Sequence, residues 1–186
     1  MPRWQRSGII MAGIAVLLVV IESVDAVMNY DLNQDGIVPR QVSGLDGILW
    51  APFLHTDFAH LFGNLLPGVI LGFLLLMARR FVVVTAIVWV ISGFGVWLTA
   101  PSGSVTIGAS GIIFGWLAYL LVRGLFNRNV WQVLGGVVLF AVYGGILWGI
   151  LPQGGGVSWQ GHLFGAAGGV LAAWLMRPKK PQPNAA

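Results

Sequence analysis

The sequence predicts an all-α protein that crosses a membrane several times, and three observations support this class. Of the 186 residues, 57% are hydrophobic and only 9% are charged, against roughly 45–50% and about 25% in soluble domains. Apolar runs of about 20 residues, the length that spans a bilayer, recur along the chain. Most of the few charges lie between these runs. A water-soluble globule and a disordered chain are therefore excluded.

The charge balance argues against a nucleic-acid partner. Ten basic and six acidic side chains leave a net charge of +4, too little basic surface to follow a phosphate backbone. Cysteine is absent, which excludes a disulfide framework, a zinc–thiolate site and a thiol nucleophile. We expect one domain, with neither a metal nor a cofactor.

Six apolar segments are candidate membrane-spanning helices. They cover residues 9–28, 58–78, 81–100, 105–122, 130–151 and 157–176. The third is the clearest, because it contains no charged residue. The first allows a second interpretation as a signal peptide, with Arg3 and Arg6 as its basic region and cleavage near Asp25. If this segment is retained as a span, we expect Glu22 and Asp25 at its water-facing end.

The basic residues predict which side of the membrane each loop faces. Nine of the ten lie at the N-terminus, after the second or fourth span, or at the C-terminus, and only Arg40 lies on the other side. The nine are Arg3, Arg6, Arg79, Arg80, Arg123, Arg128, Arg177, Lys179 and Lys180. Because basic loops stay in the cytoplasm, we expect both termini there. Residues 1–8 then form a cytoplasmic N-terminus, residues 9–176 the membrane domain and residues 177–186 a basic tail.

The first external connection, residues 29–57, is the longest loop. It starts polar and turns apolar over residues 47–54, a pattern that favours a position in the membrane interface. All six carboxylates lie between residues 22 and 57, opposite the basic side. Tryptophans near the span ends, such as Trp50 and Trp131, are typical of an aromatic belt.

Four polar side chains lie inside the predicted spans, where such groups are costly and mark functional sites. They are His60 and Asn64 in the second span, Ser110 in the fourth and His162 in the sixth. At a rise of about 1.5 Å per residue, Ser110 lies roughly 20 Å above the cytoplasmic boundary, and Asn64 and His162 roughly 22 Å. His60 lies one turn above Asn64 on the same helix face. We therefore expect these groups in one layer near the outer face.

That layer contains the groups needed for acyl transfer. A serine hydroxyl needs a base to become a nucleophile, and His162 is the only histidine in the last three spans. The Asn64 amide, the His60 imidazole and the Ser110 backbone N–H could stabilise the oxyanion. No carboxylate is available at that depth, so the sequence predicts a Ser–His dyad rather than a triad.

Glycines provide close contact between the fourth and sixth spans. Gly111 and Gly115 are spaced four apart, as are Gly161, Gly165 and Gly169. Such small-residue stripes allow two helices to pack backbone against backbone in lipid. We expect this packing to bring Ser110 and His162 within hydrogen-bonding distance.

Three motifs occur in order on these spans. They are His55-x4-His60-x3-Asn64, Gly108-x-Ser110-Gly111 and Gly161-His162-x2-Gly165-x3-Gly169. Together they resemble the rhomboid family of intramembrane serine proteases, and the resemblance covers residues 9–176. It implies a six-span bundle with Ser110 as nucleophile, His162 as general base, and His60, Asn64 and the Ser110 amide as the oxyanion hole. Gly108, Gly111, Phe114 and Gly165 would then support the site by packing.

Two positions depart from the family pattern. Many rhomboids carry a Trp-Arg pair nine and eight residues before the histidine that matches His55, where this chain has Asp46 and Gly47. The tyrosine that often stacks on the catalytic histidine is replaced by Phe114, which keeps the ring and lacks the hydroxyl. Neither departure removes a group of the dyad, so we expect them to affect stability and substrate handling more than catalysis.

The resemblance implies a serine endopeptidase that cleaves transmembrane-helix substrates near the outer face of the membrane. So compact a core with no appended domain suits a prokaryotic plasma membrane. The partners of the enzyme would be membrane-protein substrates and the bilayer, with lateral entry near the second and fifth spans under a cap at residues 153–157. Two other interpretations stay open: a non-catalytic scaffold for single-span proteins, and a small channel or transporter that uses His162. His60 and Asn64 could also simply tie the second span to the first loop, and Asp57 is expected to start a helix. The oligomeric state is not predicted.

Overall fold

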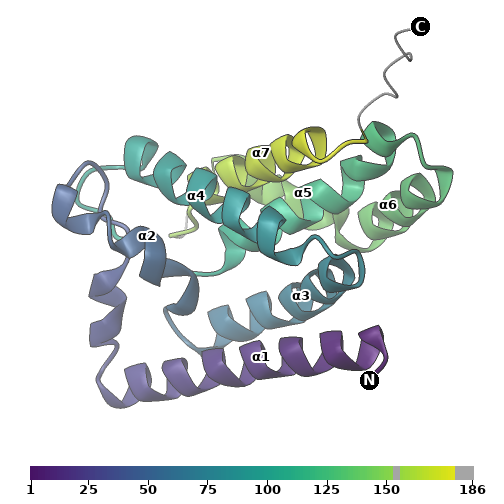
Figure 1. Ribbon diagram of the computed structural model, residues 1–186. Helices are drawn as coiled ribbons and strands as arrows, with labels where there is room; N and C mark the ends of the chain where they lie inside the picture. The colour runs from purple at the N-terminus through teal and green to yellow at the C-terminus, as the bar shows by residue number, and fades with distance from the viewer. Residues whose placement is uncertain (153–155, 179–186) are drawn as a thin grey trace, which may run out of the picture.

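The computed structural model describes residues 1–152 and 156–178. Its long helices are α1 (Arg3–Val27), α3 (Phe58–Met77), α4 (Phe81–Thr99), α5 (Ser110–Asn127), α6 (Val130–Tyr143) and α7 (Trp159–Leu175). The connections contain the short helices η1 (Asp31–Asp35), η2 (Val42–Gly44), α2 (Gly47–Trp50), η3 (Ala51–Phe53) and η4 (Gly144–Ile150). The long helices form one bundle (Figure 1).

Five of these helices are long and apolar enough to cross a membrane. They are α1, α3, α4, α5 and the continuous segment Val130–Ile150, which joins α6 and η4. This confirms an all-helical, multi-pass architecture. α7 has 17 residues and is shorter, so a sixth crossing stays a prediction.

The start of α1 and the end of α7 lie at the same end of the bundle, beside the connection between α3 and α4 (Figure 1). There Arg3 Nη1 donates to the carbonyl of Met77 over 3.3 Å. This arrangement fits termini on one side of the membrane, whereas the identity of that side stays a prediction.

α5 occupies the centre of the bundle. It packs against α7, α4, α6 and α3, and Leu117 at its middle is fully buried. By contrast, α6 exposes large apolar side chains such as Val137 and Phe140. An apolar outer surface of this kind is stable in lipid rather than in water. Burial at α5 and exposure at α6 therefore both follow from a bundle surrounded by hydrocarbon.

Glycines form the contact between α5 and α7. A Cβ at Gly165 would collide with the carbonyl oxygen of Gly111, and one at Gly169 would collide with that of Gly115. The two backbones therefore touch directly, as the glycine spacing predicts. Side chains near these glycines on α5 and α7 are therefore held close to one another.

Several helix boundaries differ from the sequence-based prediction. α1 begins at Arg3 rather than residue 9, and α5 covers Ser110–Asn127 rather than residues 105–122. The late start of α5 follows from Gly108, whose φ of +112° is incompatible with a right-handed helix. α6 ends at Tyr143, because the glycines at 144 and 145 weaken the α-helix and the chain continues as the 3₁₀-helix η4.

Glu22 and Asp25 lie in the last turns of α1, but the expectation that their side chains face water is wrong. Each side chain is only 1% exposed. They point toward the protein because the chain folds back after α1, where Asp25 Oδ1 accepts a 2.8 Å hydrogen bond from the Leu32 N–H. The carboxylate thus satisfies a backbone donor of the turn that follows the helix.

The loop at residues 29–57 folds against the end of α4. Trp89 Nε1 donates to the carbonyl of Ile48 over 2.6 Å, and Trp97 Nε1 donates to that of Gln41 over 2.9 Å. Arg40 Nη1 donates to the carbonyls of Leu98 and Ala100 at the C-terminal end of α4, where the helix dipole favours a cation. Loop and helix therefore form one packed unit beside the start of α5.

Candidate active site

Ser110 and His162 meet across the contact between α5 and α7. The distance between Ser110 Oγ and His162 Nε2 is 2.8 Å. On the other side of the ring, His162 Nδ1 lies 3.0 Å from the carbonyl oxygen of Gly149. A carbonyl can only accept, so the neutral imidazole carries its proton on Nδ1. Nε2 is then the acceptor for the serine hydroxyl, which is the arrangement a general base requires.

The backbone of η4 supplies the group that orients His162. A Cβ at Gly149 would lie 2.9 Å from Phe114 Cζ and 3.0 Å from His162 Nδ1, so a larger residue would push the carbonyl away. Sequence reasoning missed this partner, because a backbone carbonyl leaves no residue-type signal. The glycines that end α6 were the only available indication.

The Phe114 ring stacks on one face of the His162 imidazole. The two ring centroids are 4.0 Å apart and the ring planes differ by 4°. Phe114 lies one helical turn after Ser110, so both side chains project from the same face of α5. His162 is 8% exposed. The stacked ring and the surrounding helices therefore shield the dyad from most of the solvent.

Because Gly108 has no side chain, the His60 ring has room near Ser110. A Cβ at Gly108 would lie 2.9 Å from His60 Nε2 and 3.9 Å from Ser110 Oγ. The Thr56 N–H points at His60 Nδ1 over a long 3.4 Å, with Thr56 Oγ1 at 3.3 Å from the same nitrogen. An N–H can only donate, so Nδ1 accepts and the neutral ring carries its proton on Nε2, beside the serine.

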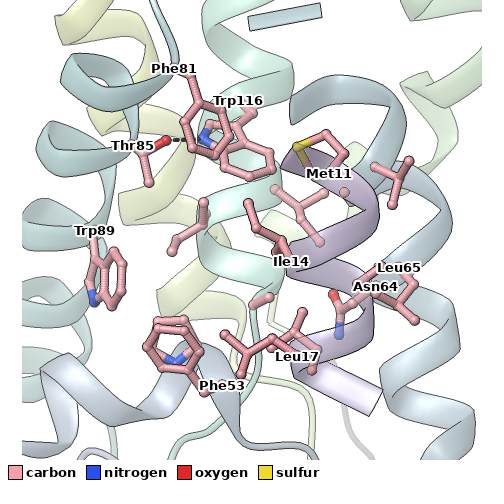
Figure 2. A pocket seen from close by; sticks show the side chains of 18 residues that line it. Met11, Ile14, Leu17, Phe53, Asn64, Leu65, Phe81, Thr85, Trp89 and Trp116 are labelled. Carbon is pink, nitrogen blue, oxygen red and sulfur yellow. Dashed lines mark hydrogen bonds between the residues drawn. The ribbon is translucent and has the colours of Figure 1, made fainter. Parts of the chain in front are cut away.

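Asn64 is engaged within its own helix. Its Nδ2 donates to the carbonyl of His60 over 3.1 Å, and its side chain also lies on the wall of an apolar cavity (Figure 2). The predicted role of Asp57 as a helix start is confirmed, because its Oδ1 accepts a 2.7 Å hydrogen bond from the His60 N–H. Of the predicted oxyanion donors, His60 therefore contacts both Thr56 of the loop and the space beside Gly108, whereas Asn64 is bonded to the backbone of its own helix.

His55 supports His60 from behind. It is fully buried, and the two imidazoles meet edge to face with 5.0 Å between centroids and 72° between planes. Asn33 Nδ2 donates to the His55 carbonyl over 3.0 Å, which ties η1 to this point. Burial, and then the nearby charge of His60, lower the pKa of His55 to about 4. His55 is therefore neutral at pH 7.

A small cavity lies beside the serine. Its volume is about 30 Å³, and its wall includes Ser110, Ser92 and Ser158. Ser92 Oγ donates to the carbonyl of Gly161 over 2.8 Å, which links α4 to α7 at this depth. A space of this size with serine residues on its wall can hold one water molecule. Ser92 was not singled out from the sequence, where it is one hydroxyl in an otherwise apolar span.

Two sequence-based expectations involve other parts of the chain. Within residues 1–152 and 156–178, no three His, Asp or Glu side chains come together as metal ligands would. Of the predicted cap at residues 153–157, positions 153–155 lie outside the described residues.

Comparison with known proteins identifies the family of this chain. The model of the Rhomboid domain matches residues 43–179. An uncharacterised protein of Mycobacterium tuberculosis is 47% identical over 185 residues, which cover 94% of this chain and 77% of the relative. One of Mycobacterium leprae is 45% identical over 184 residues, covering 94% and 73%.

A more distant relative carries a functional description. A Bacillus subtilis protein named "Putative rhomboid protease YdcA" is 30% identical over 131 residues, covering 68% of this chain and 65% of its own. No solved structure matches the chain significantly. The Rhomboid domain match spans the three motifs and most of the bundle, and on this basis the chain belongs to the Rhomboid family.

Proposed function

We propose that this protein is an intramembrane serine endopeptidase that cleaves transmembrane-helix substrates with a Ser110–His162 dyad. One observation carries the proposal: His162 accepts from Ser110 Oγ at 2.8 Å while its other nitrogen is held by Gly149 at 3.0 Å. If Ser110 and His162 served only to pack the helices together, the imidazole would not have to be fixed in one tautomer. This arrangement gives the histidine both the lone pair and the orientation that a base needs.

In the first step, Ser110 Oγ attacks the carbonyl carbon of the scissile peptide bond. His162 Nε2 takes the hydroxyl proton as the new C–O bond forms, and Gly149 accepts a hydrogen bond from the resulting imidazolium. The C–N bond then breaks, and His162 returns the proton to the leaving amine. The product of this half-reaction is an ester of Ser110.

The negative charge that develops on the carbonyl oxygen needs donors arranged in advance. Ser110 is the first residue of α5, and the N–H groups of a first helical turn have no partner within the helix. The Nε2–H group of His60 lies next to Gly108, which precedes Ser110 by two residues. Asn64 is the least direct member of this set, because one of its two amide hydrogens is given to the His60 carbonyl.

Hydrolysis of the ester requires water in a largely apolar bundle. The cavity of about 30 Å³ beside Ser110 has room for one molecule. His162 takes a proton from that water as the water oxygen attacks the ester carbon. It then protonates Ser110 Oγ as the acyl group leaves. The dyad is thereby regenerated.

A serine-directed fluorophosphonate probe tests the proposal. We expect covalent labelling of the purified protein in detergent, and none of Ser110→Ala or His162→Ala. Ser104→Ala is the matched control, because Ser104 lies in the loop between α4 and α5 and donates only to the Pro101 carbonyl. Labelling that persists in Ser110→Ala would contradict the assignment of Ser110 as the nucleophile, and an absence of labelling in the unaltered protein would favour a non-catalytic scaffold instead.

A further inference from the structure

A second cavity lies on the side of the bundle away from α7. It has a volume of about 260 Å³ between α1, α3, α4 and α5, and the dyad chemistry does not use it. Figure 2 shows its two ends: Phe53, Leu17 and Asn64 lie at one, and Phe81 and Trp116 at the other. On α4, Phe81 and Trp89 are eight residues apart, which corresponds to about 12 Å along the helix. The cavity is thus elongated along the helices.

The wall of this cavity offers few hydrogen-bonding groups to water. Its lining is apolar except at Asn64 and Thr85 and at the indole N–H groups of Trp89 and Trp116. Asn64 donates to the His60 carbonyl, Trp89 to the Ile48 carbonyl, and Trp116 to Thr85 Oγ1 at 3.0 Å. Because most of these groups are already hydrogen-bonded, the cavity resembles dry apolar cavities, which at about 150 Å³ stay free of water and bind benzene.

The cavity opens toward the surrounding bilayer. α1 packs mainly on α3, whereas α4 packs on α7 and α5, so the side between α1 and α4 is left uncovered. No charged side chain lines the cavity, so its wall offers nothing to a charged headgroup. A single flexible hydrocarbon chain fits both this apolar lining and the elongated shape.

We propose that this cavity binds one acyl chain of a membrane phospholipid, lying parallel to the helices between α1 and α4. The chain of the lipid would cover Leu65 and Ile14 and reach the wall that carries Asn64 and Ala109, the residue before Ser110. Binding is driven by the dispersion contacts that an empty apolar space would lack. The lipid site thus lies directly behind the proposed oxyanion donors.

Small residues on two walls, Gly68 and Ala15, allow a clean test. Gly68 lines the cavity, and a Cβ there would meet Ile113 only at an ordinary 3.6 Å, so Gly68→Leu fills the space without a backbone collision. Ala15→Phe fills it from α1 on the opposite wall. Gly63→Leu and Gly13→Leu are the matched controls on the same two helices, since a Cβ at either position has nothing within 4 Å.

The full chain is reconstituted with a phospholipid that carries a diazirine in one acyl chain, irradiated, and digested for mass spectrometry. We expect adducts concentrated on Leu65, Ile14 and Phe53, reduced at least fivefold by each filling variant and unchanged in each control. If one filling variant does not fold, the other gives the answer. Equal labelling in filled and control proteins, or cross-links to a second copy in place of lipid, would overturn the proposal.

Discussion

The ring of Phe114 lies flat against the imidazole of His162, with 4.0 Å between centroids and 4° between planes. Together with the hydrogen bonds to Gly149 and Ser110, this contact holds the histidine on three sides. The imidazole is therefore positioned before any substrate arrives. Such preorganisation reduces the rearrangement required during reaction.

Replacing the stacked ring should lower activity moderately. Aromatic stacking contributes about 0.5–1.5 kcal/mol beyond burial, so we expect Phe114→Leu to reduce kcat about 2- to 10-fold, while Phe114→Tyr stays near the unaltered rate. Cleavage of a fluorogenic transmembrane peptide in liposomes measures this. Phe62→Leu is the control, because Phe62 is exposed on α3. Equal rates for Phe114→Leu and Phe62→Leu would show that the stacking has no catalytic role.

Gly108→Ala should impair the reaction by displacing His60. The added methyl would lie 2.9 Å from His60 Nε2, and overpacking of this kind costs about 1–3 kcal/mol. Gly103→Ala introduces the same left-handed strain, with φ of +81°, but meets nothing within 4 Å. We expect kcat for the liposome substrate to fall at least tenfold in the first variant and little in the second. A similar loss in both would assign the effect to backbone strain alone.

The contact between α5 and α7 predicts a difference in stability between two glycine substitutions. Gly165→Ala forces the helices apart at Gly111, whereas Gly135→Ala on α6 adds a methyl in open space. We expect the first to lower the free energy of unfolding in detergent by about 1–3 kcal/mol. Circular dichroism during denaturant titration measures it. The account of this contact fails if Gly165→Ala is as stable as Gly135→Ala.

His55 predicts a pH dependence of stability. Its pKa is about 4 in the folded protein and about 6.5 in an unfolded chain. Between these values the unfolded state binds more protons, so the free energy of unfolding decreases as the pH falls from 6.5 toward 4. The decrease in the free energy of unfolding that is attributable to His55 approaches about 3 kcal/mol.

His55→Phe isolates that contribution, because phenylalanine keeps an aromatic edge toward His60 and does not titrate. We expect the unaltered protein to lose more of its unfolding free energy than the variant between pH 7 and pH 4.5. The neighbouring side chains of His60 and Asp57 are present in both proteins. Parallel pH profiles would contradict the assignment.

The sequence predicted the main helices and the pairing of Ser110 with His162 for clear physical reasons. Apolar runs mark lipid-facing helices, and the distance of each polar residue from a basic loop gives its depth. Gly149 could not be predicted in this way, because its contribution is a carbonyl placed by a 3₁₀ segment. Nor could the burial of Glu22 and Asp25, which depends on how the chain folds back after α1.

Asn64 shows a further limit of sequence reasoning. Its depth matches that of Ser110, but depth does not say which way a side chain turns around the helix axis. In the structure the amide donates to the carbonyl of His60 one turn earlier. Rotation about the helix is decided by packing against α1 and α5, which the motif alone does not encode.

The most direct test of the central claim is the cleavage of a transmembrane substrate by the purified protein in liposomes. The account predicts cleavage within the substrate's membrane segment by the unaltered protein and by Ser104→Ala. It predicts a loss of at least about 10³-fold in Ser110→Ala and in His162→Ala, with both variants still folded by circular dichroism. Cleavage that continues unchanged when the Ser110 hydroxyl is removed would contradict it.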